Sequence, residues 1–231
     1  MSNDPKILTL AFCGGILPSL FWLWFWLREK KEEPEPKIIL AICFIVGMIS
    51  VIWILPIQKF IQLHVHSSVF QIISWATVEE IIKYLVVILI LYKTVYLHEP
   101  IDWPIFLITA ALGFAAFENM LFLVKPFALG QATVGLLTGY LRYLGSTLLH
   151  AVSSGIIGIM AGLSFYFDGS RKRIYLITGF IIAIALHSVF NFFIMKNSGS
   201  EFLKIFAFLW VATIINLLLF EKLRRMSIKS S

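Results

Sequence analysis

The sequence has little charge. Only 14% of its 231 residues are Asp, Glu, Lys or Arg, whereas 59% are hydrophobic. A soluble domain has about 45–50% apolar and about 25% charged residues, so a soluble globular domain and a disordered chain are both excluded. The composition instead predicts an all-α, polytopic membrane helix bundle. The net charge of +6 is therefore not read as affinity for nucleic acid, and no nucleic-acid partner is expected.

Metal and redox motifs are scarce as well. The two cysteines, Cys13 and Cys43, both lie within apolar runs, which excludes a disulfide scaffold and predicts that both thiols are packed in the core. The His-Glu-x-x-His run of a zincin is absent, and so are the paired repeats of many transporters. We expect one membrane-embedded domain over residues 1–231, and no sequence feature sets its oligomeric state.

Seven stretches have the length of about 20 apolar residues that crosses a bilayer, so the sequence predicts about seven transmembrane helices. The fifth stretch is the longest, and its glycines predict close helix contacts or a break. Residues 58–68, between the second and third stretches, predict a short interfacial helix. The predicted spans are Ile7–Leu27, Ile38–Ile57, Val69–Tyr92, Pro104–Val124, Val134–Phe167, Ile174–Met195 and Phe202–Phe220.

Lys and Arg are distributed unequally between the two sides that seven spans define. One side carries 12 of them and the other carries 5, while Lys83 and Arg142 lie inside spans. Because positively charged loops remain in the cytoplasm, we expect a multi-pass protein of the plasma membrane with its N-terminus outside and its C-terminus in the cytoplasm.

Ionisable residues within the spans are confined to the third, fourth, fifth and sixth. Each costs roughly 2.5–3.5 kcal/mol at the centre of a membrane helix and by default marks a functional site. We therefore expect the active site among helices 3–6, in a water-accessible pocket in the outer half of the bilayer. Arg142 is expected to be structural and close to the membrane interface. The other members of this set are Glu79, Glu80, Lys83, Glu118, His150 and His187.

Such a cluster suits more than one function. His nitrogen and Glu oxygen can hold a metal, or a Glu can act as general base on water while His and Asn stabilise an oxyanion. Two alternatives from other classes remain open. One is a proton-coupled membrane transporter, because chains of Glu and His also carry protons, and the other is a non-catalytic membrane scaffold.

At these residues the sequence resembles the PrsW family of intramembrane proteases, in the clan that includes the type II CAAX prenyl proteases. The resemblance extends over about residues 70–195, which we expect to form the catalytic core. The CAAX enzymes carry His at the position of Glu118, so Glu at this position is similar to PrsW. Four motifs carry the resemblance: Glu79-Glu80-x-x-Lys83, Gly113-Phe114-x-x-x-Glu118-Asn119, His150 and His187-x-x-x-Asn191.

The resemblance implies hydrolysis of peptide bonds in a single-span membrane protein, such as an anti-sigma factor, within the lipid bilayer near its extracellular boundary. In a metalloprotease, the implied Zn²⁺ ligands are Glu118, His150 and His187, with Glu79 or Glu80 activating the water. In a metal-independent enzyme, Glu118 or His150 orients the water, and His187 with Asn191 binds the oxyanion. The implied catalytic residues are Glu79, Glu80, Glu118, His150, His187 and Asn191.

The two adjacent glutamates are expected to have different roles. Glu79 and Lys83 are four residues apart and share a helix face, so an ion pair is expected to keep Glu79 ionised as the primary base. Glu80 points elsewhere and is expected to share a proton or support the site. The reverse assignment remains open.

The unequal Lys and Arg distribution gives a testable topology. A reporter fused after Ser231 should lie in the cytoplasm, because the side with 12 positive residues carries the C-terminus. Fusions that report on cytoplasmic and external location measure this directly. An external C-terminus would contradict both the orientation and the depth expected for the site.

Overall fold

The structure, a computed structural model, describes residues 4–28, 36–91, 94, 96–196 and 202–228. Most of these residues are helical, and there is no β-strand among them. The fifth long helix consists of three consecutive parts, two α-helices and a π-helical turn between them. The elements are α1 (Pro5–Leu27), α2 (Lys37–His64), α3 (Ser68–Leu91), α4 (Asp102–Ala128), α5 (Ala132–Leu141), η1 (Arg142–Ser146), α6 (Thr147–Leu163), α7 (Gly169–Lys196) and α8 (Phe202–Ile228).

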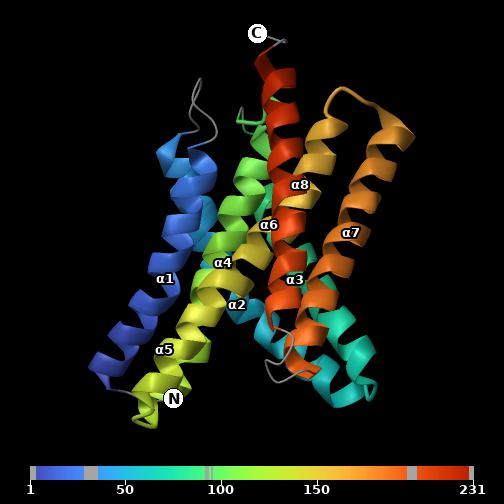
Figure 1. The fold of residues 1–231 in the computed structure, drawn as a ribbon. Helices are drawn as coiled ribbons and strands as arrows, with labels where there is room; N and C mark the ends of the chain where they lie inside the picture. Colours follow the sequence, from blue (N-terminus) through green and yellow to red (C-terminus); the bar gives the residue numbers. More distant parts are fainter. Residues whose placement is uncertain (1–3, 29–35, 92–93, 95, 197–201, 229–231) are drawn as a thin grey trace.

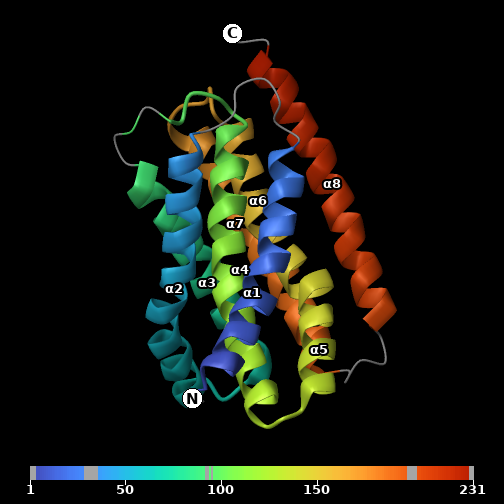
Figure 2. The same cartoon turned by 90° about the vertical axis from the view of Figure 1, so that its left-hand side faces the viewer.

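The long helices run up and down side by side in one bundle (Figures 1 and 2). Among the described residues, six helices are long and apolar enough to cross a membrane. The remaining long helix, α3, has 24 residues and carries Glu79, Glu80 and Lys83. The beginning of α1 and the end of α8 lie at opposite ends of the bundle. The predicted polytopic all-α membrane fold is confirmed.

α4 lies at the centre of this bundle. It packs against α1, α2 and α6, and also contacts α3 and α5. Alanine and glycine between Ala110 and Ala116 are buried and allow neighbouring backbones to approach closely. A Cβ atom on Gly113 would lie 2.0 Å from the carbonyl oxygen of Phe44 in α2. The central helix therefore holds its motif residues against several neighbours at once.

The fifth long helix has the break that its glycines predict. A π-helical turn separates α5 from α6, and such turns often occur at functional sites. The indole Nε1 of Trp22 in α1 donates a hydrogen bond of 3.2 Å to the carbonyl oxygen of Tyr143 in this turn. Beyond the turn, Gly158 packs against the backbone of Pro104 in α4. Both predictions for this span, close contacts and a break, are thus confirmed.

Two local predictions are wrong. No separate interfacial helix forms after the second span, because α2 continues without interruption to His64. Pro56 lies inside α2, as membrane helices permit, and the 28 residues of the helix give it a length of about 42 Å. Cys43 is buried as expected, but Cys13 is exposed on the outside of the bundle.

The contact between α1 and α4 can be tested with two neighbouring glycines. A Cβ on Gly15 would lie 2.4 Å from the carbonyl oxygen of Ala116, whereas one on Gly14 would meet only the flexible end of Leu123. Gly15→Ala should lower the free energy of unfolding in detergent by about 1–3 kcal/mol through overpacking. Gly14→Ala is the matched control, since both changes give the same helix propensity gain of about 1 kcal/mol. Equal stability of the two variants would contradict this packing.

Candidate active site

A cavity of about 800 Å³ opens between α2, α3, α4, η1, α6 and α7. Its rim includes Gln62 near the end of α2 and Met195 near the end of α7. Those two helix ends lie at the same end of the bundle as the beginning of α1 (Figures 1 and 2). The cavity is therefore in the half of the bundle nearer the start of α1.

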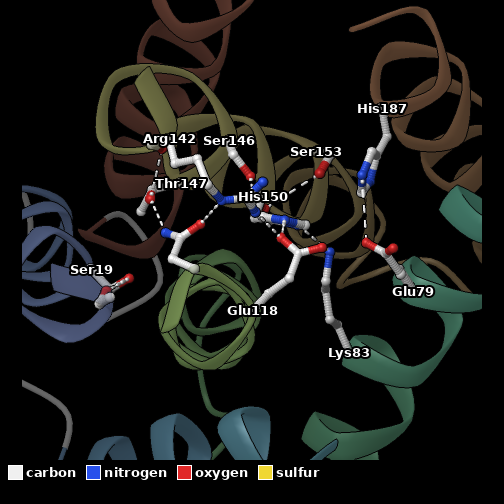
Figure 3. A network of polar contacts seen from close by, with 12 residues as sticks. Ser19, Glu79, Lys83, Glu118, Arg142, Ser146, Thr147, His150, Ser153 and His187 are labelled. Atoms are coloured by element: carbon white, nitrogen blue, oxygen red, sulfur yellow. Dashed lines mark hydrogen bonds and ion pairs between the residues drawn. The ribbon is translucent and has the colours of Figure 1, made fainter. Parts of the chain in front are cut away.

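Most of the residues implied as catalytic meet at this cavity. Its lining includes Glu79, Glu118, His150, His187 and Asn191. The four motifs are far apart in sequence and come from four different helices, yet Figure 3 shows their polar side chains directed toward one another. Glu80 is the exception, because it lies behind the cavity wall and is completely buried.

Glu80 accepts hydrogen bonds from three helices. Its Oε1 lies 2.8 Å from Lys83 Nζ, 3.0 Å from Ser153 Oγ and 2.8 Å from His187 Nδ1. Its Oε2 accepts from Ser154 Oγ at 2.7 Å. The prediction of an ion pair between Glu79 and Lys83 is therefore wrong, since Lys83 pairs with Glu80. Residues three apart and residues four apart both share a helix face, so the spacing alone allowed either glutamate. The Nζ of Lys83 also lies 2.8 Å from His150 Nδ1 of α6.

Glu79 has no Lys or Arg partner among the described residues. Its Oε1 accepts a hydrogen bond of 2.8 Å from the Gln58 side-chain amide, and Trp75 Nε1 holds the Gln58 carbonyl oxygen at 3.1 Å. Its Oε2 is buried, has no hydrogen-bond partner in the described part of the chain, and lies 3.5 Å from His187 Nε2. One oxygen of Glu79 is thus held in place by Gln58, while the other lies beside His187 without a hydrogen-bond partner among the described residues.

Glu118 is paired with Arg142. Its Oε2 contacts Arg142 Nη2 in an ion pair and lies 3.2 Å from His150 Nε2. Arg142 Nε also donates to Asn119 Oδ1 at 2.6 Å, and Arg142 Nη2 donates to Ser146 Oγ at 3.0 Å. Arg142 was expected to be structural and close to the membrane interface, and its side chain lines the cavity beside a motif carboxylate (Figure 3).

The π-helical turn explains how Arg142 reaches this place. On a regular α-helix, Arg142 and His150 are eight residues apart and would point about 80° away from each other. One π-bulge absorbs about one residue, which reduces this angle to about 20°. Thr147 Oγ1 accepts from Asn119 Nδ2 at 2.8 Å and donates to the Arg142 carbonyl oxygen at 3.1 Å. These bonds fix the widened turn against α4, so Arg142 and His150 both contact Glu118.

Three candidate metal ligands lie close together. Glu79, His150 and His187 are all buried, and one ligand atom of each lies within 4.8 Å of the others. Two imidazoles and one carboxylate form a donor set that binds catalytic zinc. Glu118, implied by the resemblance as a ligand in place of Glu79, does not belong to this group.

The contacts of these three residues decide how well they suit a metal. Glu79 Oε2 has no hydrogen-bond partner among the described residues, and His187 Nε2 faces it, so both atoms suit a metal ion. Both ring nitrogens of His150 already have partners, Lys83 at Nδ1 and Glu118 at Nε2. Two of the three donors therefore fit a metal as they stand.

Comparison with known proteins shows the family of the chain. The model of the family described as PrsW family intramembrane metalloprotease matches residues 35–219. The chain belongs to the PrsW family. Membership identifies it as a membrane peptidase, and gives no support to the transporter and scaffold alternatives.

Several bacterial relatives share nearly the whole length. Protease PrsW of Clostridioides difficile (strain 630) is 29% identical over 220 residues, which are 91% of this chain and 90% of the relative. Protease PrsW of Geobacillus kaustophilus (strain HTA426) is 26% identical over 187 residues, or 80% of this chain and 79% of the relative. Protease PrsW of Bacillus subtilis (strain 168) is 23% identical over 202 residues, or 85% and 89%. No solved structure matches the chain.

Sequence reasoning missed several residues of this PrsW site. Gln58 was expected in a separate interfacial helix, and only the continuation of α2 brings it to Glu79. Ser153 and Ser154 were a weak indication of a buried polar partner, because two adjacent hydroxyls in an apolar span need hydrogen-bond acceptors. The structure supplies Glu80 as the acceptor for both.

The pair of Glu118 and Arg142 can be tested by a double-mutant cycle. Arg142→Met should lower the free energy of unfolding by about 1–3 kcal/mol, between the values of about 0–1 for exposed and about 3–5 for buried pairs. This range applies because the two side chains are only 20% and 17% exposed. Glu118→Gln added to Arg142→Met should recover part of the loss, with a coupling of about 0.5–3 kcal/mol.

The control for this cycle is Glu221→Gln in α8. Glu221 pairs with Arg224 and Arg225 and is 32% exposed, so its replacement should cost only about 0–1 kcal/mol. Additive effects at Glu118 and Arg142, measured by unfolding in mixed micelles, would show that the pair is not energetically coupled.

Proposed function

We propose that this PrsW family member hydrolyses a peptide bond with Glu79 as the general base. The observation that carries the proposal is that only two of the three motif carboxylates have a cationic partner among the described residues. Glu80 is balanced by Lys83 and Glu118 by Arg142. Glu79, which lines the cavity, has no Lys or Arg partner in the described residues and keeps one oxygen without a hydrogen-bond partner beside His187. An ionised carboxylate with a free oxygen is what a base needs.

The reaction follows from the positions of these groups. Glu79 Oε2 takes a proton from a water molecule while the water oxygen attacks the scissile carbonyl carbon. The carbonyl oxygen becomes an oxyanion, and the side-chain amide of Asn191, which lines the same cavity, is a donor for it. When the C–N bond breaks, the proton held by Glu79 passes to the leaving nitrogen. Gln58 keeps the other oxygen of Glu79 fixed throughout.

The remaining motif residues support this reaction. Arg142 holds Glu118 beside His150, so Glu118 is proposed to orient the water or the substrate. If Zn²⁺ binds, Glu79 Oε2 and His187 Nε2 are the atoms that would hold it, and it would supply a polarised, more acidic water. The catalytic residues of the proposal are Glu79, Glu80, Glu118, His150, His187 and Asn191, with Glu80 acting through its neighbours.

The proposed substrate is a single-span membrane protein, of the anti-sigma-factor kind, cut near its extracellular boundary. The cavity lies in the half of the bundle that contains the start of α1, and the Lys and Arg distribution assigns that end to the outside. A helix hides its carbonyl groups in hydrogen bonds to the residue four positions later. Substrates with Gly or Pro near this boundary are therefore proposed to be cut in preference to uninterrupted helices.

The role of Glu79 is tested with a panel of tagged single-span proteins in vesicles. Glu79→Gln should lower the cleavage rate by about 10²–10⁴-fold, the usual cost of losing a general base, while the unfolding transition stays close to wild type. Glu80→Gln should lower stability as well as activity, because it leaves Lys83 without its counter-charge. Mass spectrometry of the products should place the cut on the external side.

Glu221→Gln is the matched control for these variants, since it removes a carboxylate far from the cavity. A folded Glu79→Gln variant that cleaves at the wild-type rate would refute Glu79 as the base. Products cut at the cytoplasmic side would refute the placement of the site while leaving its chemistry intact.

A further inference from the structure

The two histidines of the cavity contact opposite kinds of group at Nδ1. His150 Nδ1 lies 2.8 Å from the Lys83 ammonium nitrogen, and His187 Nδ1 lies 2.8 Å from Glu80 Oε1. The two rings are close neighbours, with centroids 5.1 Å apart. A neutral imidazole has one N–H and one bare nitrogen, so the partner at one nitrogen decides what the other offers to the cavity.

At His150 the partner is a donor. Lys83 is completely buried, forms an ion pair with Glu80, and lies 4.7 Å from the centroid of the Phe114 ring, which also favours a cation. An ammonium group has donors and no acceptor, so Nδ1 of His150 must be the bare nitrogen. The proton is then on Nε2, where Glu118 Oε2 accepts it at 3.2 Å. The contacts at both ends of the ring agree on this tautomer.

At His187 the partner is an acceptor. Glu80 is paired with a cation and already accepts from Ser153 and Ser154, as expected of a carboxylate. A carboxylate only accepts hydrogen bonds, so Nδ1 of His187 carries the proton. In the neutral ring Nε2 is then bare, and at 3.5 Å from Glu79 Oε2 it forms no hydrogen bond with that carboxylate.

We infer that Lys83 and Glu80 are positioning residues that hold the two histidines in opposite tautomers, so that His150 offers an Nε2–H donor and His187 offers a bare Nε2. Resting on the proposed function, this makes His150 an N–H donor that holds Glu118 and leaves the oxyanion to the side-chain amide of Asn191. His187 then accepts a hydrogen bond from the water next to Glu79. This assignment differs from the pairing of His187 with Asn191 as oxyanion donors that the resemblance implies.

The same assignment separates the histidines as metal ligands. A metal binds the bare nitrogen of an imidazole, and a carboxylate on the other N–H orients the ring for it. His187, with Glu80 at Nδ1, has this arrangement, and His150 has the reverse. A divalent ion should therefore bind to His187 and Glu79 without removing the proton from His150.

The test is nitrogen NMR of the full chain in detergent with ¹⁵N-labelled histidine. Protonated and bare ring nitrogens have well-separated shifts, and spectra of His150→Gln and His187→Gln assign the two signals. Wild type should show His150 protonated at Nε2 and His187 protonated at Nδ1. Identical tautomers, the reversed pair, or a doubly protonated ring at either position would overturn the inference. These spectra need no substrate, so they do not depend on whether Glu79 is the base.

Two variants test the positioning roles. Lys83→Met removes the donor at Nδ1 and should convert His150 to a mixture of tautomers, whereas Ser154→Ala removes a bond to Glu80 that touches neither ring and should leave both signals in place. If Lys83→Met does not fold, Lys83→Arg is the second variant. It retains a donor and should retain the His150 tautomer. An unchanged His150 signal in Lys83→Met, or a changed one in folded Lys83→Arg, would overturn the role of Lys83.

Addition of Zn²⁺ gives an independent readout. The Nε2 signal of His187 should shift on binding, while the Nε2–H signal of His150 should persist. Loss of the His150 proton together with a shift of both rings would show that His150 is a ligand and would overturn the separation of the two histidines.

Discussion

Glu80 is a carboxylate with no access to solvent inside a membrane helix, and its charge has to be balanced within the protein. Lys83 supplies the opposite charge from the same helix, and Ser153, Ser154 and His187 supply hydrogen bonds from α6 and α7. Removing any of these partners would leave part of a buried charge unsatisfied. The meeting of α3, α6 and α7 at one depth therefore depends on this one carboxylate.

The balance of Glu80 also determines what the neighbouring groups can do. Lys83 is occupied by Glu80 and His150 and leaves Glu79 without a cation. Arg142 in the same way is occupied by Glu118 and its neighbours on η1 and α4. Two of three carboxylates are thus neutralised by fixed cations, and the third faces a cavity large enough for water. The proposal of Glu79 as the base rests on this unequal distribution of positive charge.

The sequence was sufficient for the helix bundle and for most of the cavity residues, because ionisable groups in membrane helices are costly and their clustering in four spans is conspicuous. It was not sufficient for the pairing of Lys83, since spacings of three and four residues share a helix face equally well. Which glutamate Lys83 meets is decided by the packing of α6 on α3. Contacts between helices distant in sequence carry no such local signal.

Arg142 shows a different limit of sequence reasoning. Its direction depends on the position of the π-helical turn, and the glycines of the fifth span indicate a break without fixing its place. Without a π-turn between them, Arg142 and His150 would point about 80° away from each other and could not both contact Glu118. Gln58 was missed for a related reason, because the second span was predicted to end at Ile57, whereas α2 continues to His64. Arg142 and Gln58 can be assigned to the site only when the exact course of their helices is known.

The position of the cavity along the bundle limits what a substrate helix has to do. The lining of the cavity extends from Val51 at the middle of α2 to Gln62 and Met195 in the last turns of α2 and α7. The last four carbonyl groups of any helix lack a partner within the helix. A substrate helix that ends at this depth already has carbonyl groups free of helical hydrogen bonds, so fewer bonds must be opened than at the bilayer centre. For the proposed single-span substrate, a cavity that extends to one end of the bundle therefore requires Gly or Pro only to release the final turn of the helix.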